Sequence, residues 1–199
     1  MTKRTGVQDM SIADFIIAVF CLIDDELKKV LNGKRLRQRG PSPGLQDSEV
    51  ITMEIVGEFL GKDCDKTIWE YFKGHWMHFF PKIPNRSNFV RQAANLHVVK
   101  RMLQEDLALN GLHLQTPLRD NMVDSRPQQF LGWMKGTRRL IETVIGQLAE
   151  RFHIEKIRAR DLWHEASRFW RKLLAHTVCV KLSIEQEHEP LQFERLVTV

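Results

Sequence analysis

The sequence predicts a mainly α-helical protein. Apolar residues recur at intervals of three and four along most of the 199 residues, which is the spacing of one face of an α-helix. Residues that typically start or end helices, such as Ser11 and Gly61, stand at the borders of these segments. Only residues 112–116, LHLQT, alternate between apolar and polar side chains in the way of a short strand, between Gly111 and Pro117.

Four helices are predicted before this strand. Ser11, with Asp14 three residues later, can cap the first helix, and Asp47 can cap the second. Glycines mark the ends of the second and third helices. The predicted ranges are residues 11–31, 48–60, 65–74 and 87–111.

The segment NGKRLRQRGPSPG, residues 32–44, is predicted to be a loop because it combines two prolines with three glycines. It also carries four basic residues, including Arg35 and Arg37. It is therefore either a solvated connector or an arm that contacts phosphates.

Two long helices are predicted after the strand, over residues 136–152 and about 160–182. In the first, apolar residues form one stripe, and Glu142 lies at its edge, with Gly146 and Ala149 leaving a shallow groove beside the carboxylate. The stripe consists of Leu140, Ile141, Val144, Ile145, Leu148 and Phe152. In the last helix, the basic residues Arg168, Arg171 and Lys172 are expected on a solvated face.

Lys and Arg outnumber Asp and Glu by 30 to 25, an excess that permits a polyanionic partner without requiring one. Many cations lie on predicted helices whose other faces are apolar, Lys100 among them, and Trp163 and Trp170 lie near some. The DNA-binding candidates are Arg35, Arg37, Arg86, Arg91, Arg138, Arg139, Arg158 and Arg160.

The three cysteines are far apart and form no CxxC motif, which argues against a disulfide framework or a structural zinc site and favours a reducing cytoplasm. The most apolar run, residues 15–23, is too short to span a membrane. We therefore expect a soluble cytoplasmic protein with no membrane partner.

Several stretches resemble bacterial insertion-sequence transposases of the Asp-Asp-Glu type. The resemblance lies in TPLRDNMVDSRP, RRLIETVIGQLAERFHIEKIRARDLWH, RKLLAHT and PLQFERLV, which are similar to the C-terminal part of such chains. The N-terminal helical region through FFPKIPNRSNFVRQAANLHVVK is similar to their N-terminal part. Together these stretches cover nearly the whole sequence.

This resemblance implies DNA transposition, in which the enzyme cleaves DNA at the ends of a mobile element and joins the freed 3′ hydroxyl to target DNA. Family members have a ribonuclease-H-like α/β catalytic domain in which three carboxylates hold two divalent ions, usually Mg²⁺. The glutamate of the RRLIETV block is the third carboxylate, which implies a catalytic and metal-binding role for Glu142.

The sequence departs from the family where the two catalytic aspartates should lie. Between NLHVVK and QEDLALNGLHLQTP there is no room for the strands that carry them, and Asp106, Asp120 and Asp124 do not match their positions. The chain is therefore interpreted as an internally deleted copy, with a helical N-terminal region over residues 1–100, which is a candidate DNA-binding region, and a truncated catalytic domain over residues 101–199. The truncated domain would retain the short strand and the two long helices.

Two functions follow. The first is a transposase-family protein that is catalytically incomplete, because one glutamate cannot hold a pair of Mg²⁺ ions in octahedral geometry. The second is a non-catalytic regulatory fragment that binds DNA or an intact transposase. Expected partners are DNA at insertion-sequence ends, a second copy of the chain, or an intact transposase. By spacing alone, Glu142 could instead form an ordinary surface pair with Arg138.

Overall fold

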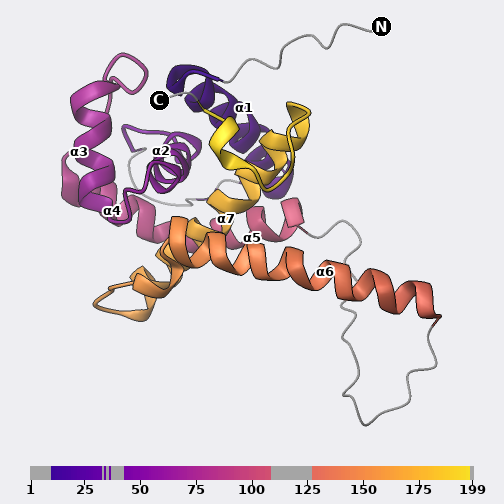
Figure 1. Ribbon diagram of the computed structural model, residues 1–199. Coiled ribbons are helices and arrows are strands. Elements are labelled where there is room, and N and C mark those ends of the chain that lie inside the picture. Colours follow the sequence, from indigo (N-terminus) through magenta and orange to yellow (C-terminus); the bar gives the residue numbers. More distant parts are fainter. Residues whose placement is uncertain (1–9, 33, 35, 37–42, 109–126, 198–199) are drawn as a thin grey trace, which may run out of the picture.

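The computed structural model describes residues 10–32, 34, 36, 43–108 and 127–197, and its regular elements are helices (Figure 1). The predicted mainly α class is confirmed. The helices are α1 (Ile12–Leu31), α2 (Asp47–Phe59), α3 (Asp65–His75), α4 (Arg86–Asn95), α5 (His97–Ala108), α6 (Gln128–Gly146) and α7 (Leu162–Glu185). Within these ranges, strand-like pairing is limited to an isolated parallel bridge between Met10 and Val197. The predicted strand at 112–116 lies outside the described residues.

The first helix begins where its capping residue predicts, and the second begins close to its predicted start. Ser11 accepts a hydrogen bond from the Asp14 amide at 3.1 Å, which satisfies one of the donors left open at the start of α1. Helix α2 begins one residue earlier than predicted, because Gln46 rather than Asp47 occupies the cap position. The Gln46 amide donates to the Glu49 carboxylate, which draws the first turn together.

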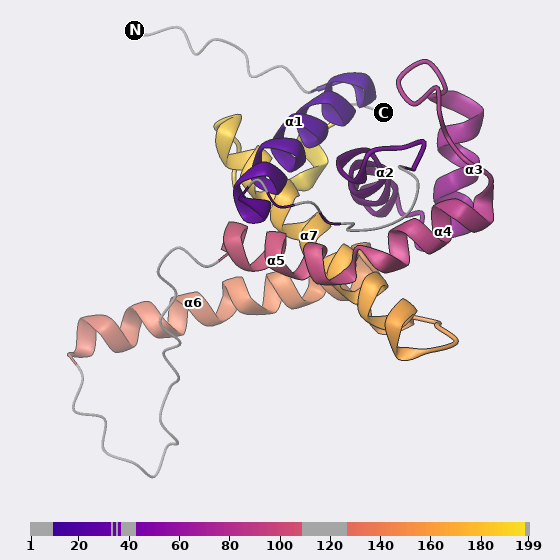
Figure 2. The same ribbon diagram turned by 180° about the vertical axis from the view of Figure 1, so that it is seen from behind.

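The single helix predicted over residues 87–111 is wrong, because the structure contains two helices there, α4 and α5 (Figure 2). They meet at Leu96, which is buried and whose ψ of 6° leaves the helical range. No proline or glycine marks this break. Both helices pack against α7, so apolar residues recur at helical spacing on both sides of the break. A prediction from the sequence therefore gives one continuous helix.

Helix α2 lies at the centre of the fold and is buried on almost every side (Figure 1). Helices α1, α3, α4 and α7 pack around it. The approach of α3 is especially close, because a Cβ atom on Gly57 would lie 2.6 Å from the Ile68 side chain. The core combines residues from both ends of the chain, including Phe15, Phe89 and Leu174.

Charged side chains are buried inside this apolar core. Glu54 and Glu58 of α2 have almost no exposed surface. Lys100 of α5 places its ammonium 2.9 Å from the Glu54 carboxylate and 2.8 Å from the Ser167 hydroxyl. Burial raises the pKa of Glu54 and lowers that of Lys100, while their direct pairing opposes both shifts.

Arg171 of α7 is the centre of this buried charge cluster. Its guanidinium lies 2.6 Å from Glu58 and 2.5 Å from Asp65, the first residue of α3. Burial opposes the charged form of Arg171, but the surrounding carboxylates outweigh burial and raise its pKa. Lys172, the next residue, lies 2.8 Å from the second oxygen of Glu58. Arg171 therefore holds α2, α3 and α7 together.

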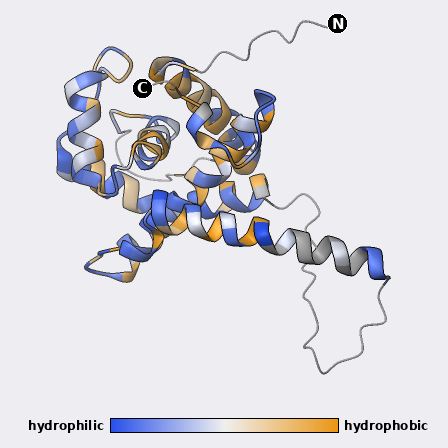
Figure 3. Ribbon diagram, viewed as in Figure 1, coloured by the Kyte–Doolittle hydropathy of each residue, from blue (hydrophilic) through white to orange (hydrophobic). Residues whose placement is uncertain are grey.

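Helix α6 extends away from the other helices in both ribbon views (Figures 1 and 2). The predicted apolar stripe of this helix is exposed at three of its six residues. Leu140, Ile141 and Ile145 each expose more than half of their surface, and the hydropathy colouring shows hydrophobic positions along this projecting part (Figure 3). Phe152, at the far end of the stripe, is buried.

The base of α6 is fixed by a π-helical turn, Gln147–Arg151. The side-chain amide of Gln147 donates a hydrogen bond from Nε2 to the Leu191 carbonyl oxygen at 2.6 Å. The Oε1 atom of the same side chain lies 3.1 Å from Nε2 of His176. The His176 ring also packs edge-on against Phe152 and Phe193. Burial in these apolar surroundings lowers the pKa of His176 to about 4.

None of the described helices combines the length with the apolar character needed to cross a bilayer. Cys21, Cys64 and Cys179 are free thiols.

Replacement of Arg171 by Met should strongly destabilise the fold, because the three buried carboxylates would then outnumber their buried cations. Removal of one partner from a buried ion pair lowers the free energy of unfolding by about 3–5 kcal/mol. Urea unfolding followed by circular dichroism would measure this loss. Arg139→Met, which removes an exposed cation from α6, is the matched control, and a loss for Arg171→Met no larger than that of the control would refute the role of Arg171.

Stability should also fall as the pH is lowered from 6.5 to 4, because the unfolded chain binds a proton at His176 that the folded chain excludes. The contribution of His176 is complete above its unfolded pKa of 6.5 and is lost as pH falls towards about 4. The shift corresponds to about 3 kcal/mol at most. The difference between the wild-type protein and His176→Gln, measured by urea unfolding across this range, isolates the effect. Parallel curves for the two proteins would contradict it.

Candidate nucleic-acid interface

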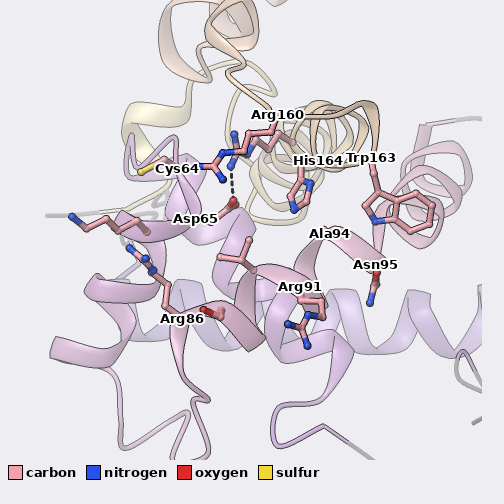
Figure 4. Close-up of a pocket in the computed structure, with 13 residues that line it drawn as sticks. Cys64, Asp65, Arg86, Arg91, Ala94, Asn95, Arg160, Trp163 and His164 are labelled. Carbon is pink, nitrogen blue, oxygen red and sulfur yellow. Dashed lines mark hydrogen bonds and ion pairs between the residues drawn. The ribbon is translucent and has the colours of Figure 1, made fainter. Parts of the chain in front are cut away.

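A pocket of about 570 Å³ opens where α3, α4 and α7 begin (Figure 4). Arg86 and Arg91 lie on one side of this space, and Arg160, Trp163 and His164 lie on the other. Its full lining is Cys64, Asp65, Lys66, Arg86, Ser87, Val90, Arg91, Ala94, Asn95, Arg160, Trp163, His164 and Arg168.

The lining is strongly basic. It contains four arginines and one lysine against a single carboxylate, Asp65. That carboxylate is already engaged by Arg171 and Arg168. In the part of the chain that the structure describes, no acidic side chain forms an ion pair with Arg86, Arg91 or Arg160. The pocket therefore carries a net positive charge that an anion could balance.

The backbone adds to this positive potential. Residues in the first turns of three helices line the pocket, among them Lys66 of α3, Ser87 of α4 and Trp163 of α7. Helix N-termini carry partial positive charge and amide donors without helical partners. They reinforce the attraction that the arginine side chains exert on an anion.

Arg168 joins the pocket to the buried charge cluster. Its guanidinium donates to Asp65 at 2.8 Å and also to the carbonyl oxygen of Arg158. Burial opposes the ionisation of Asp65, but Arg171 and Arg168 outweigh burial and lower its pKa to about 2. Asp65 is therefore charged at neutral pH, and through Arg168 it holds the segment that carries Arg158 and Arg160 against α3.

A second pocket of about 450 Å³ is continuous with the first, because Val90, Arg160, His164 and Arg168 line both. It adds Arg158, Ala159 and Asp161 to the shared lining, and the Asp161 carboxylate lies 2.8 Å from Nδ1 of His164. We call the two pockets together the basic groove. It runs from Lys66 at the start of α3 to Arg158 in the segment before α7.

An aromatic ring borders the groove. Trp163 exposes about half of its surface (49%), and its ring centroid lies 3.9 Å from that of His97. Asn95, the last residue of α4, lies beside it in the pocket lining (Figure 4). The groove thus presents an accessible aromatic ring next to its cations.

The predicted DNA-binding residues fall into three groups. Arg86, Arg91, Arg158 and Arg160 line the basic groove, although they come from separate segments of the sequence. Arg139 is exposed on α6, away from the groove lining, and Arg138 lies on the same helix. Arg35 and Arg37 lie outside the described residues.

Three other cations do not lie on a solvated surface as expected. Lys100, Arg171 and Lys172 are fully buried and paired with Glu54, Glu58 and Asp65. The expectation failed because helical spacing shows which residues share a face but not which element covers that face. Buried carboxylates on α2, more than 40 residues away from each of these cations, cannot be inferred from local sequence.

Glu142 is exposed on α6 and does not line the basic groove. A pocket of about 430 Å³ does lie beside Gly146, as the small residue suggested, but its lining includes Glu150 and Arg151 and not Glu142 or Ala149. Among the described residues, no group of three His, Cys, Asp or Glu side chains is placed to hold a metal ion. Asp120 and Asp124 lie outside these residues.

Sequence reasoning missed several residues of the groove, among them Lys66, Ser87, Asn95 and His164. A local signal existed for some of them, because Asn85 and Asp161 are good helix caps and both cap in the structure. These caps mark helix starts, where anions tend to bind. The convergence of three such starts at one place is a property of the tertiary structure.

No protein-family model, curated protein or solved structure matches this chain. Function is therefore inferred from the basic groove and from the resemblance of the sequence.

Proposed function

We propose that this chain is a transposase-family protein that binds DNA, including insertion-sequence ends, through the basic groove and does not cut DNA by itself. The observation that carries the proposal is the cluster of cations in the groove. Arg86, Arg91 and Arg160 have no acidic partner in the described part of the chain, and phosphate groups are natural counterions for such arginines.

The donor set supports binding rather than cleavage. Transposase chemistry of the Asp-Asp-Glu type requires several carboxylates around two divalent ions. Glu142 is exposed on a projecting helix, and within the described ranges it belongs to no group of three potential ligands. The residues present in these ranges do not fit a Mg²⁺ pair, so we derive no cleavage step for this chain.

The exposed stripe of α6 supports the interpretation as a deleted copy. In our proposal, α6 and α7 are the helices that remain from a ribonuclease-H-like catalytic domain, and the missing strands once covered the stripe. Leu140, Ile141 and Ile145 are more exposed than is usual for one side of a long helix. Removal of a covering sheet accounts for this exposure.

The same stripe favours a second function, that of a regulatory fragment. An exposed apolar strip on a projecting helix can pack against an apolar surface of another chain. We propose an intact transposase as this partner, because its sheet offers the surface that this chain lacks. A chain that occupied that surface would reduce the activity of the transposase.

DNA binding should depend on the groove and on salt. With a labelled DNA that contains a duplex and an unpaired 3′ tail, fluorescence anisotropy should show an affinity that falls linearly with the logarithm of salt concentration. Arg91→Ala should weaken binding and reduce the salt slope by about one, because one phosphate contact is lost. Arg101→Ala, which removes an exposed arginine that pairs with Glu105 on α5, is the matched control. Absence of DNA binding, or an affinity insensitive to salt, would refute the proposal.

In the same preparation, DNA that contains an insertion-sequence end should stay intact when Mg²⁺ is added. Nicking that requires Mg²⁺ and disappears in Glu142→Gln would instead establish a competent catalytic centre.

Association with an intact transposase should depend on the stripe. The tagged chain should retain a co-expressed transposase of the resembling family, and Ile141→Glu together with Ile145→Glu should abolish retention by placing charge in an apolar contact. Ile17→Glu, at an isoleucine of α1 that is also about half exposed (49%), controls for added charge. If the chain does not co-purify with the transposase and leaves its activity unchanged, the regulatory function is refuted.

A further inference from the structure

The basic groove has an apolar floor as well as basic walls. Val90 and Ala94 of α4 are apolar members of the groove lining, on the helix that also carries Arg86 and Arg91. Phosphate groups gain nothing from contact with apolar side chains, whereas sugars and the faces of bases can pack against them. The floor therefore indicates a ligand that brings apolar surface together with negative charge.

The exposed aromatic ring indicates the same kind of ligand. Trp163 lies at the border of the groove with about half of its surface open. One side of the ring contacts His97, and the ring is not part of the hydrophobic core. Every nucleic-acid base can stack on such a ring, and cations beside exposed aromatic residues are typical of proteins that bind single strands.

We infer that the basic groove holds an unpaired, single-stranded segment of DNA, with phosphates at Arg86, Arg91 and Arg160 and a base against Trp163. This inference rests on the proposed function, since it specifies the form of DNA that the groove accepts. The contacts do not depend on base sequence, because they involve phosphates and the faces of bases.

Duplex DNA fits the same groove poorly. Its bases are stacked inside the helix, so a duplex lying across the groove would touch the arginines with its phosphates and leave Val90, Ala94 and Trp163 without a partner. The two continuous pockets, of about 570 and 450 Å³, are in the size range of sites for small organic ligands. They are suited to a few nucleotides of one strand.

The three cations are placed to follow such a strand. Arg86 and Arg91 project from α4, and Arg160 projects from the segment before α7 on the opposite side (Figure 4). Arg168 fixes that segment through the Arg158 carbonyl and Asp65. The walls of the groove are therefore held in position before any ligand binds, which lowers the entropy cost of binding.

The test compares labelled oligodeoxynucleotides of about 12 residues, as single strands and as blunt duplexes, by fluorescence anisotropy with the full chain. The single strand should bind about tenfold more tightly or better. Trp163→Leu should weaken single-strand binding by roughly 5- to 150-fold, which corresponds to the loss of one base stacked on an aromatic ring. It should leave duplex binding nearly unchanged. Trp163→Phe, which keeps a ring, should retain most of the single-strand affinity.

The outcomes separate the inference from the proposed function. Equal or tighter binding of the blunt duplex would overturn the inference while leaving DNA binding intact. Failure to bind either form would overturn both. Circular dichroism of the Trp163 variants checks that they fold, and the strand preference of the wild-type protein tests the inference even if a variant does not.

Discussion

The contact between Arg171 and the carboxylates of Glu58 and Asp65 organises this fold. Arg171 comes from α7, Glu58 from the buried central helix α2, and Asp65 from the first turn of α3. A buried guanidinium is tolerated only with such partners, because desolvation of an unpaired charge costs far more than any single contact returns. The chain must therefore bring these three helices together whenever it buries the apolar residues beside them.

The groove is a consequence of this arrangement. One oxygen of Asp65 forms an ion pair with Arg171 and the other forms one with Arg168. The same carboxylate therefore joins α3 to α7 in the interior and fixes the position of Arg168 near the surface. Arg168 then holds the segment that carries Arg158 and Arg160. These contacts bring the starts of α3 and α7 together beside the start of α4, where Arg86, Arg91 and Arg160 give the groove its positive charge.

Helix α6 shows the opposite situation, a helix whose apolar face has no cover in the described structure. Its base is fixed by Gln147 and by the ring cluster around His176, but Leu140, Ile141 and Ile145 remain exposed. A helix of this length gains most of its stability from packing an apolar face. The deleted-copy interpretation attributes this exposed face to the loss of a covering sheet. The regulatory alternative adds that another protein now covers the face.

The helical class and most helix borders could be predicted from the sequence, because apolar spacing and caps such as Ser11 act within a few residues. The sequence also identified Arg86, Arg91, Arg158 and Arg160 as a set of candidate DNA contacts, but only as members of a longer list. Tertiary structure decided which cations are available, since Lys100, Arg171 and Lys172 are neutralised by carboxylates distant in the chain. It also decided the break at Leu96, the projection of α6 and the meeting of three helix starts, because each of these depends on which surfaces pack together.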